Sequence, residues 1–135
     1  MIASKKQTGD KMEKKSKIDT EDTIKKTDNY LKGYQLNRKL LRLDRYEKEY
    51  FHTDENDFEA YGEAPLARAR MFEIRHFIMS LKNSDEKLML YYHYVKGESI
   101  ERCAELLGIG RSSAFRMRRR ALIMAGEQLK AKTQN

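Results

Sequence analysis

The sequence predicts an all-α protein, in which a long N-terminal helix is followed by a C-terminal helical bundle. Glycine and proline together supply only eight of the 135 residues, and charged residues make up 36%. This composition is typical of soluble helical proteins and unusual for sheets. Large apolar residues recur at spacings of three, four and seven, which place them on one face of a helix. Residues suited to capping helices stand between these periodic segments.

The N-terminal part is predicted to consist of a tail and a helix. Residues 1–19 are rich in lysine and poor in large apolar groups. They cannot bury enough surface to offset the entropy of ordering, so we expect a flexible basic tail. Residues 20–51 are predicted to form one helix with a single broad apolar face. This face is either the contact surface of a homodimer or partner protein, or a lid that packs on the bundle. The contact surface is the preferred interpretation. The face consists of Leu36, Leu40, Leu43 and Tyr50, with Leu31, Tyr34, Leu41 and Tyr46 nearby.

An acidic loop is predicted over residues 52–65. Residues 53–65 hold five acids, no basic residue and the only proline of the chain, Pro65. A proline suits the first turn of a following helix. We expect a solvated loop here rather than a DNA mimic or a polymerase-binding segment.

A compact helical domain is predicted over residues 66–130, with a short tail at 131–135. Its first helix, residues 66–81, carries an apolar set at helical spacing. Asn83 has the spacing to Glu86 of a capping box, so a second helix should begin at residue 84. That helix should end near Gly97, and Ser99 should cap a third helix over residues 100–107. The apolar set of the first helix is Met71, Ile74, Phe77, Ile78 and Leu81.

A turn and a basic helix follow the third helix. Two helices that cross steeply need a small residue at their contact and a residue tolerant of positive φ in the turn. Ala104 and Gly108 meet these two needs, and Ile109 supplies an apolar plug behind the turn. The final helix, residues 111–129, is expected to pack inward through one face at about 100° per residue. That face consists of Ala114, Met117 and Ala121, extended by Ala125.

The opposite side of the final helix is basic, because residues 111–120 contain five arginines and no acid. Small hydroxyls at the start of a helix, with arginines behind them, suit a helix in the major groove of DNA. There the first turn contacts base edges and later side chains reach phosphates. The predicted DNA-binding residues are Arg111, Ser112, Ser113, Arg116, Arg119 and Arg120.

The arginines are expected to differ in role. Arg116 is the candidate for a bidentate guanine contact, whereas Arg119 and Arg120 suit phosphates. Arg111 and Arg118 lie closer to the inward side of the helix. We expect them to make flanking phosphate contacts or an ion pair with a residue such as Glu105.

Composition and motifs also exclude several classes. The net charge of +7 favours an anionic partner. The single cysteine, Cys103, excludes an internal disulfide and is expected to be a small buried hydrophobe, and the histidines lack metal-ligand spacing. We expect no metal, no cofactor and no membrane span, and a cytoplasmic location. Without a phosphate loop, an activated nucleophile or a carboxylate cluster, we do not expect an enzyme.

Residues 88–122, LMLYYHYVKGESIERCAELLGIGRSSAFRMRRRAL, resemble the helix-turn-helix of sigma-factor region 4. That pattern has leucines, a tyrosine and then Gly-x-Ser-x-x-x-x-Ala-x-x-Leu-Gly-Ile. One departure is Ser113-Ala114, where sigma factors commonly have Thr-Val. The matching residues are Tyr94, Gly97, Ser99, Ala104, Leu107, Gly108 and Ile109.

The second half of this stretch is more similar to the ArpU-type family of phage transcriptional regulators. In that family an aromatic, an arginine and an aliphatic residue precede a basic run and an Ala-Leu pair, and residues 115–122 follow this order. The resemblance covers roughly residues 66–127, with Gly110 in place of the usual serine cap. It implies a phage or prophage late-gene activator that binds promoter double-stranded DNA and acts with host RNA polymerase. A single helix-turn-helix buries only about 600–1,000 Å² on DNA, so a second copy or tethering to polymerase is expected.

Three other functions remain open. A phage small terminase or another DNA-packaging protein also uses a helix-turn-helix, commonly near its N-terminus and ahead of a ring-forming segment. A protein-interaction module would use the basic face to bind an acidic partner. A membrane-surface role is the least favoured, because the basic helix lacks a bulky apolar opposite side.

Overall fold

In the computed structural model, the described residues are 2–51 and 63–133, with side chains described at residue 17, at 19–50 and at 64–132. These parts of the chain are helical and contain no strand, which confirms the all-α prediction. The helices are α1 (Ile2–Phe51), α3 (Glu63–Met79), α4 (Ser84–Leu90), the π-helix η1 (Tyr91–Val95), α5 (Ile100–Leu107) and α6 (Arg111–Thr133).

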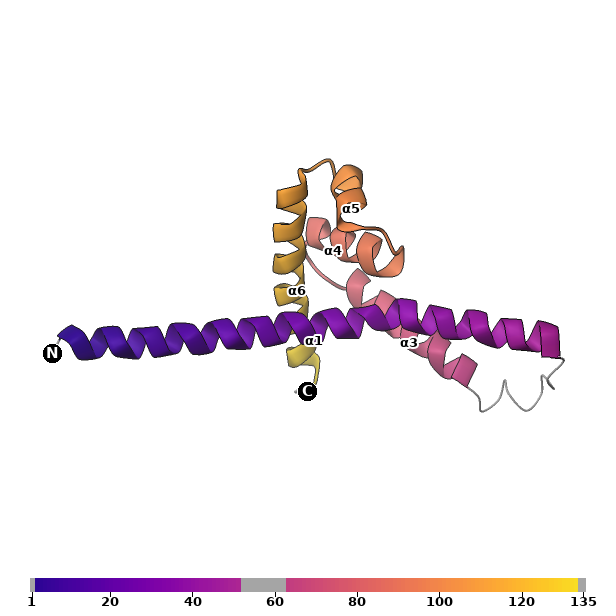
Figure 1. Cartoon of the computed structure of the whole chain (residues 1–135), viewed down its shortest axis with the longest axis horizontal. Helices are drawn as coiled ribbons and strands as arrows, with labels where there is room; N and C mark the ends of the chain where they lie inside the picture. Colours follow the sequence, from indigo (N-terminus) through magenta and orange to yellow (C-terminus); the bar gives the residue numbers. More distant parts are fainter. Residues whose placement is uncertain (1, 52–62, 134–135) are drawn as a thin grey trace.

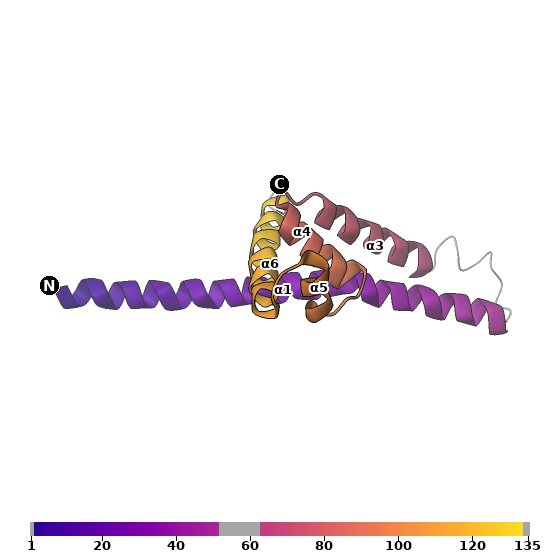
Figure 2. The ribbon, with the colours of Figure 1, turned by 90° about the horizontal axis from the view of Figure 1, so that it is seen from above.

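Helix α1 runs along the whole length of the molecule, and α6 crosses it steeply near the middle (Figure 1). The N-terminal half of α6 stands on one side of α1 together with α4, η1 and α5. Seen from above, α3 lies beside the C-terminal half of α1 and runs in the opposite direction (Figure 2). The bundle is therefore built on α1 from about Glu21 onward, and the part of α1 before it projects beyond the bundle.

The structure differs from the predicted basic tail over residues 1–19, because α1 already begins at Ile2. Residue 1 lies outside the described residues. Lysine, which is frequent here, is a good helix former. Residues that extend an existing helix avoid the cost of a new nucleus. The lysine-rich composition of residues 1–19 argues against a hydrophobic core in this segment, but it is compatible with the continuation of a helix.

The prediction of one broad apolar face on α1 is wrong, because the apolar residues divide between two opposite faces. Leu31 is fully buried, whereas Leu36 and Leu43 are each 60% exposed. Tyr34 and Leu41 are half-buried. Residues two apart on a helix point about 200° apart, so Leu36 lies opposite Tyr34, and Leu43 lies opposite Leu41. The second face also includes Leu40, Tyr46 and Tyr50.

The predicted caps of the bundle helices are present. The Asn83 side chain accepts hydrogen bonds from the backbone N–H groups of Asp85 and Glu86, at 3.1 and 3.2 Å. Ser99 Oγ accepts from the N–H of Arg102 at 3.1 Å, and Gly97 has φ +74°. The starts of α4 and α5 are therefore satisfied by the side chains that the sequence indicates.

The second bundle helix ends near Gly97 as predicted, but its last turn is π-helical, because α4 passes into η1. Its closing bond runs from the N–H of Lys96 to the carbonyl of Tyr91, at 3.1 Å. Gln35 on α1 donates from Nε2 to the carbonyls of Tyr94 and Val95, at 3.2 and 2.8 Å. A side chain of α1 thus satisfies carbonyls that a helix end leaves without an internal partner.

Two domain boundaries shift. Helix α3 begins at Glu63, so it includes the last residues of the predicted acidic loop, and residues 52–62 of that loop lie outside the described residues. Pro65 falls in the first turn, as predicted. Helix α6 continues to Thr133, beyond the predicted tail boundary at residue 131, with Lys130 and Lys132 in its last turn. Positive charge there is favourable at a helix C-terminus.

The core has two parts. The larger joins α1, α3, η1 and α6 around Phe77, Ile78 and Leu122. The smaller joins α4, α5 and the start of α6 around Met89 and Cys103. The smaller cluster positions the candidate site.

Candidate nucleic-acid interface

Helices α5 and α6 are joined by a tight turn over residues 108–110. Ala104 is buried in the contact between the helices, and Gly108 has φ +68°. The N–H of Ile109 donates to the carbonyl of Ala104 at 2.9 Å, and Ile109 packs against the smaller core cluster. A side chain with a Cβ is strained at this positive φ, which explains glycine at position 108. These placements agree with the predicted roles of Ala104, Gly108 and Ile109.

The inward face of α6 is also as predicted. Ala114, Ala121 and Ala125 are fully buried, and Met117 is partly buried against the smaller cluster. Small side chains let α6 approach its neighbours closely. The side of α6 that faces away from the bundle therefore carries the polar residues.

The predicted DNA-binding residues share the outer side of the first half of α6. Ser112 is exposed, and so are Arg111, Arg116, Arg119 and Arg120. Ser113 is half-buried, and its Oγ accepts a hydrogen bond from Arg116 Nη2 at 3.3 Å. The site thus combines two hydroxyls in the first turn with guanidinium groups in the next two turns.

Sequence reasoning missed the carboxylates that pair with these arginines. Four of the five arginines form ion pairs with described residues: Arg111–Glu101 at 3.3 Å, Arg118–Asp28 at 3.0 Å, Arg119–Glu21 at 2.6 Å and Arg120–Glu86 at 4.0 Å. Two of the acids lie on α1, far from α6 in the sequence, so no local pattern indicates them. Among the side chains that the structure describes, no carboxylate pairs with Arg116, which leaves its charge the least compensated of the five.

Arg111 and Arg118 each form an ion pair, one of the two roles expected of them, but neither pairs with Glu105, the partner suggested as an example. Glu105 accepts from Arg102 Nη1 at 2.7 Å, three residues earlier on the same helix. Side chains at this spacing are neighbours on a helix surface. The partner of Arg118 is Asp28 on α1 instead.

Asp28 forms the centre of a partly buried polar cluster that ties α1 to α6. Its Oδ1 accepts from Tyr94 Oη at 2.5 Å and from Arg118 Nη2 at 3.0 Å, and its Oδ2 pairs with Lys32 at 2.8 Å. Burial opposes ionisation of Asp28, but hydrogen bonds from Lys32 and Tyr94, aided by the charges of Lys32 and Arg118, hold its pKa below the usual value. Burial, and then the bond to Asp28, raise the pKa of Tyr94. Arg118 therefore has a structural role inside the protein.

A further exposed residue of this surface is Phe115, which the sequence-based site omits. Its side chain is 43% exposed, and the Arg111 guanidinium lies 5.7 Å from its ring centre. Phe115 is three residues after Ser112 and directly before Arg116, so helical spacing already places it on the outward face. It adds an apolar surface next to the hydroxyls.

Other polar candidates are satisfied within the fold. His93 Nδ1 lies 2.7 Å from the carbonyl of Glu98, as expected for a satisfied histidine. Cys103 is fully buried, and burial followed by the charge of Glu98 raises the pKa of its thiol. Over the described ranges, no group of His, Cys, Asp and Glu side chains is arranged to hold a metal ion. None of the helices described is both long enough and apolar enough to span a bilayer.

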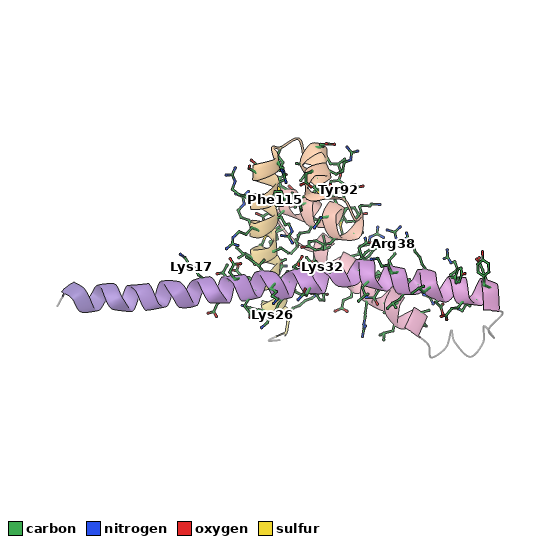
Figure 3. All side chains as sticks on the ribbon, in the orientation of Figure 1. Lys17, Lys26, Lys32, Arg38, Tyr92 and Phe115 are labelled. Carbon is green, nitrogen blue, oxygen red and sulfur yellow. The ribbon has the colours of Figure 1, made fainter. Side chains whose placement is uncertain are left out.

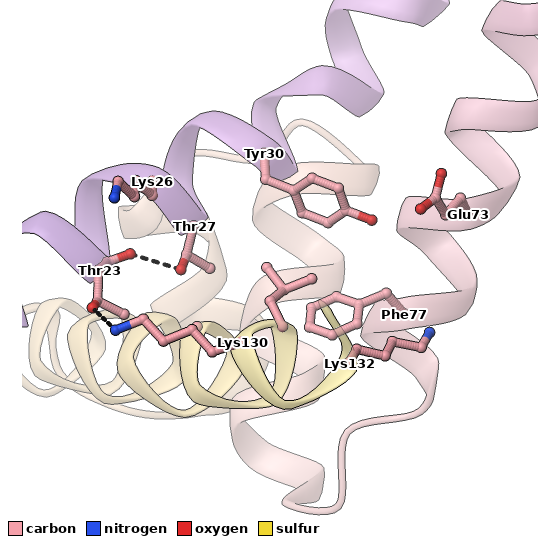
Figure 4. A pocket seen from close by; sticks show the side chains of 10 residues that line it. Thr23, Lys26, Thr27, Tyr30, Glu73, Phe77, Lys130 and Lys132 are labelled. Carbon is pink, nitrogen blue, oxygen red and sulfur yellow. Dashed lines mark hydrogen bonds between the residues drawn. The ribbon is translucent and has the colours of Figure 1, made fainter. Parts of the chain in front are cut away.

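A pocket of about 500 Å³ lies between α1, α3 and α6 (Figure 4). The Tyr30 ring meets Phe77 edge to face at 5.9 Å, and Lys132 lies over Phe77. Lys130 Nζ donates to Thr23 Oγ1 at 2.9 Å. Burial, and then the charge of Glu73, raise the pKa of Tyr30. The pocket is mostly apolar, and Lys130 reaches across its edge to α1, so it marks the junction of the helices.

No protein-family model, curated protein or solved structure matches this chain. The candidate interface therefore has to be argued from its geometry. Helices α5 and α6 pack together at the buried Ala104, and this packing leaves the hydroxyl and guanidinium groups of α6 on the outer side.

Proposed function

We propose that this chain binds double-stranded DNA through the first half of α6 and acts as a transcriptional regulator rather than as an enzyme. The observation that carries the proposal is the orientation of α6. Its inner face is buried through Ala114 and Ala121, and its start lies at the end of the bundle farthest from α1 (Figure 1). A protruding helix of this kind has the width and the exposed polar face that the DNA major groove accepts.

The roles of the side chains follow from their positions along α6. Ser112, Ser113 and Arg116 lie on the exposed first two turns, where helices in the major groove contact base edges. Arg116 pairs with no carboxylate of the described side chains and can donate two hydrogen bonds to guanine O6 and N7. Arg119 and Arg120, farther along the helix, suit phosphates, and Arg111 suits a flanking phosphate.

The regulatory role is proposed from the resemblance to sigma-factor region 4 and the ArpU-type family. By that resemblance, the chain is a phage or prophage regulator, an activator of late genes that works with host RNA polymerase in the cytoplasm. A general physical argument also supports cooperation. One module of this size covers too little DNA surface for tight specific binding, so a second contact is required.

A homodimer through the exposed face of α1 is a proposed second contact. Leu36, Leu40, Leu43 and Tyr50 are separated by four, three and seven residues, the a/d spacing of paired helices. Replacing Leu36 and Leu43 by serine should convert a dimer into a monomer in sedimentation equilibrium. A ring of about eight subunits would instead favour the DNA-packaging alternative.

The DNA-binding proposal is tested by mapping bound genomic fragments with the wild type and with Arg116→Ala. We expect the wild type to select a defined sequence and the variant to lose that selection. Arg116→Lys keeps the charge but not the bidentate geometry, so it should lose about 1–3 kcal/mol of discrimination for guanine. Arg70→Ala is the control, because this exposed arginine lies on α3. Equal binding to all sequences by the wild type would contradict the proposal.

A further inference from the structure

A hollow of about 220 Å³ lies in the groove between α1 and α3, away from α6. Its floor is apolar and comes from Tyr34 and Leu41 of α1 and from Met71 and Phe72 of α3. Phe72 is 71% exposed, an unusual state for a phenylalanine in a bundle of this size. The groove therefore presents apolar surface that no described part of the chain covers.

Arginines border this apolar floor on both helices. Arg68 and Arg75 of α3 line the hollow. On α1, Arg38 and Arg45 are two turns apart and lie on the same flank as Tyr34 and Leu41 by helical spacing. Arg38 projects from α1 toward the side on which the bundle stands (Figure 3). The border of the groove is therefore strongly positive. On α1, helical spacing places the acid Glu49 near this border, one turn beyond Arg45.

Among the residues whose side chains are described, no carboxylate pairs with the arginines of this groove, in contrast to those of α6. Each of Arg38, Arg45, Arg68 and Arg75 is exposed, and none of them pairs with a carboxylate of the described residues. On α6, four of the five arginines already have an acidic partner. The groove thus holds a cluster of guanidinium groups that remain available to an external anion.

We infer that this groove is a docking site for an acidic amphipathic helix of a partner protein. An amphipathic helix inserts apolar side chains at i and i+4 into a hydrophobic groove. Carboxylates along its edges would meet the guanidinium groups in charge-assisted hydrogen bonds. A nucleic acid backbone would satisfy the arginines but would leave Phe72 and Met71 without an apolar partner. The combination of an apolar floor and a basic border therefore favours a protein segment.

The inference does not depend on DNA binding by α6. The groove is formed by α1 and α3, and the candidate DNA contacts lie on α6. Each proposal can fail while the other holds.

The test uses the full chain and a fluorescent synthetic helical peptide with leucine and phenylalanine at i and i+4 and glutamate between them. Fluorescence anisotropy gives the dissociation constant. The double variant Arg68→Glu/Arg75→Glu should weaken binding about ten-fold or more, because it reverses two border charges. Phe72→Ala should weaken it by a similar factor, because it removes the apolar contact at the centre of the groove.

Two matched controls come from α3 itself. Arg70 is exposed, but helical spacing places it on the opposite flank of α3 from Arg68 and Arg75. Leu66 is likewise exposed away from the hollow. Arg70→Glu and Leu66→Ala should each leave the dissociation constant within about two-fold, a change typical of residues outside an interface. Circular dichroism of each variant verifies that the helices persist.

Three outcomes would overturn the inference. In the first, the peptide binds no better than a version in which glutamine replaces each glutamate. In the second, Phe72→Ala binds the peptide as the wild type does. In the third, Arg68→Glu/Arg75→Glu loses DNA affinity as Arg116→Ala does while peptide binding is unchanged, which would make the groove a nucleic-acid surface.

Discussion

Arg119 Nη2 lies 2.6 Å from Glu21 Oε1, and this ion pair joins the outward face of α6 to α1. The two side chains are 52% and 62% exposed. An anion that approaches α6 can therefore reach Arg119, but it must displace Glu21. If DNA phosphate binds here, α1 supplies an internal competitor for it.

Replacing Glu21 by glutamine should strengthen DNA binding, because the competing carboxylate disappears. Exposed ion pairs contribute at most about 1 kcal/mol, so the dissociation constant should fall by a factor of about five or less. Filter binding at low salt, where surface charge is least screened, gives the clearest readout. Asp22→Asn is the control for net charge, since Asp22 pairs with Lys26 on α1 itself. Equal gains in both variants would show that net charge, and not the pair with Arg119, is responsible.

The salt dependence of DNA binding should be shallower than the arginine count suggests. Five phosphate contacts would give a slope of log affinity against log salt of about −4.5, at about −0.9 for each phosphate. Arg118 is held by Asp28, and Arg116 is assigned to a base. The remaining three, Arg111, Arg119 and Arg120, predict a slope of about −2.7. Titrations at four or more salt concentrations measure it, and Arg120→Ala should reduce its magnitude by about 0.9.

Local signals made most of the bundle predictable from the sequence. Asn83 and Ser99 cap their helices because a short polar side chain before an apolar period has few other structural roles. Gly97 and Gly108 adopt positive φ, as their positions at helix ends require. The inward alanines of α6 follow from helical periodicity alone.

Features that depend on α1 were not predictable in this way. The pairs of Glu21 with Arg119 and of Asp28 with Arg118 join residues about 90 or more positions apart, so no local period indicates them. The two apolar faces of α1 are an exception, because helical spacing alone places Leu36 opposite Tyr34 and Leu43 opposite Leu41; only which face meets the bundle requires the structure. The π-helical turn is accompanied by a tertiary contact that no local pattern indicates, the bonds from Gln35 to the carbonyls of Tyr94 and Val95.

Replacing Asp28 by asparagine should destabilise the protein near neutral pH and much less in acid. The substitution removes a charge that Lys32 and Arg118 share, which should cost about 1–3 kcal/mol of unfolding free energy. The pKa of Asp28 is lowered from 3.8 in the fold. Its stabilising effect is therefore present above the unfolded-state value and is lost as the pH falls from about 3.8 through the folded pKa.

Urea denaturation at pH 7 and at successive values below pH 4 measures this difference. The gap between the wild type and Asp28→Asn should narrow as the pH falls. Asp22→Asn, in an exposed pair, should change stability by no more than about 1 kcal/mol at any pH. A gap that stays constant down to the acid transition would mean that the charge of Asp28 does not contribute.

Replacing Gly126 by alanine should loosen the crossing of α1 and α6. A Cβ at this position would overlap the Thr23 side chain and lie 2.6 Å from Thr27 Oγ1. Thr27 cannot easily turn away, because its hydroxyl donates to the Thr23 carbonyl at 2.7 Å. The helices must therefore separate, at a cost of about 1–3 kcal/mol.

Thermal and urea denaturation of Gly126→Ala should show this loss, and Gly110→Ser provides the comparison. Nothing lies within 4 Å of a Cβ at Gly110, and serine is a favourable N-cap residue. The free energy of unfolding of Gly110→Ser should therefore differ from that of the wild type by roughly a few tenths of a kcal/mol. Separation at Gly126 also moves α1 away from the arginines of α6. The alanine variant should therefore bind DNA more tightly per folded molecule, as Glu21→Gln does. Unchanged stability would show that α1 does not pack on α6 at Thr23 and Thr27, and the argument for α1 as an internal competitor would fail with it.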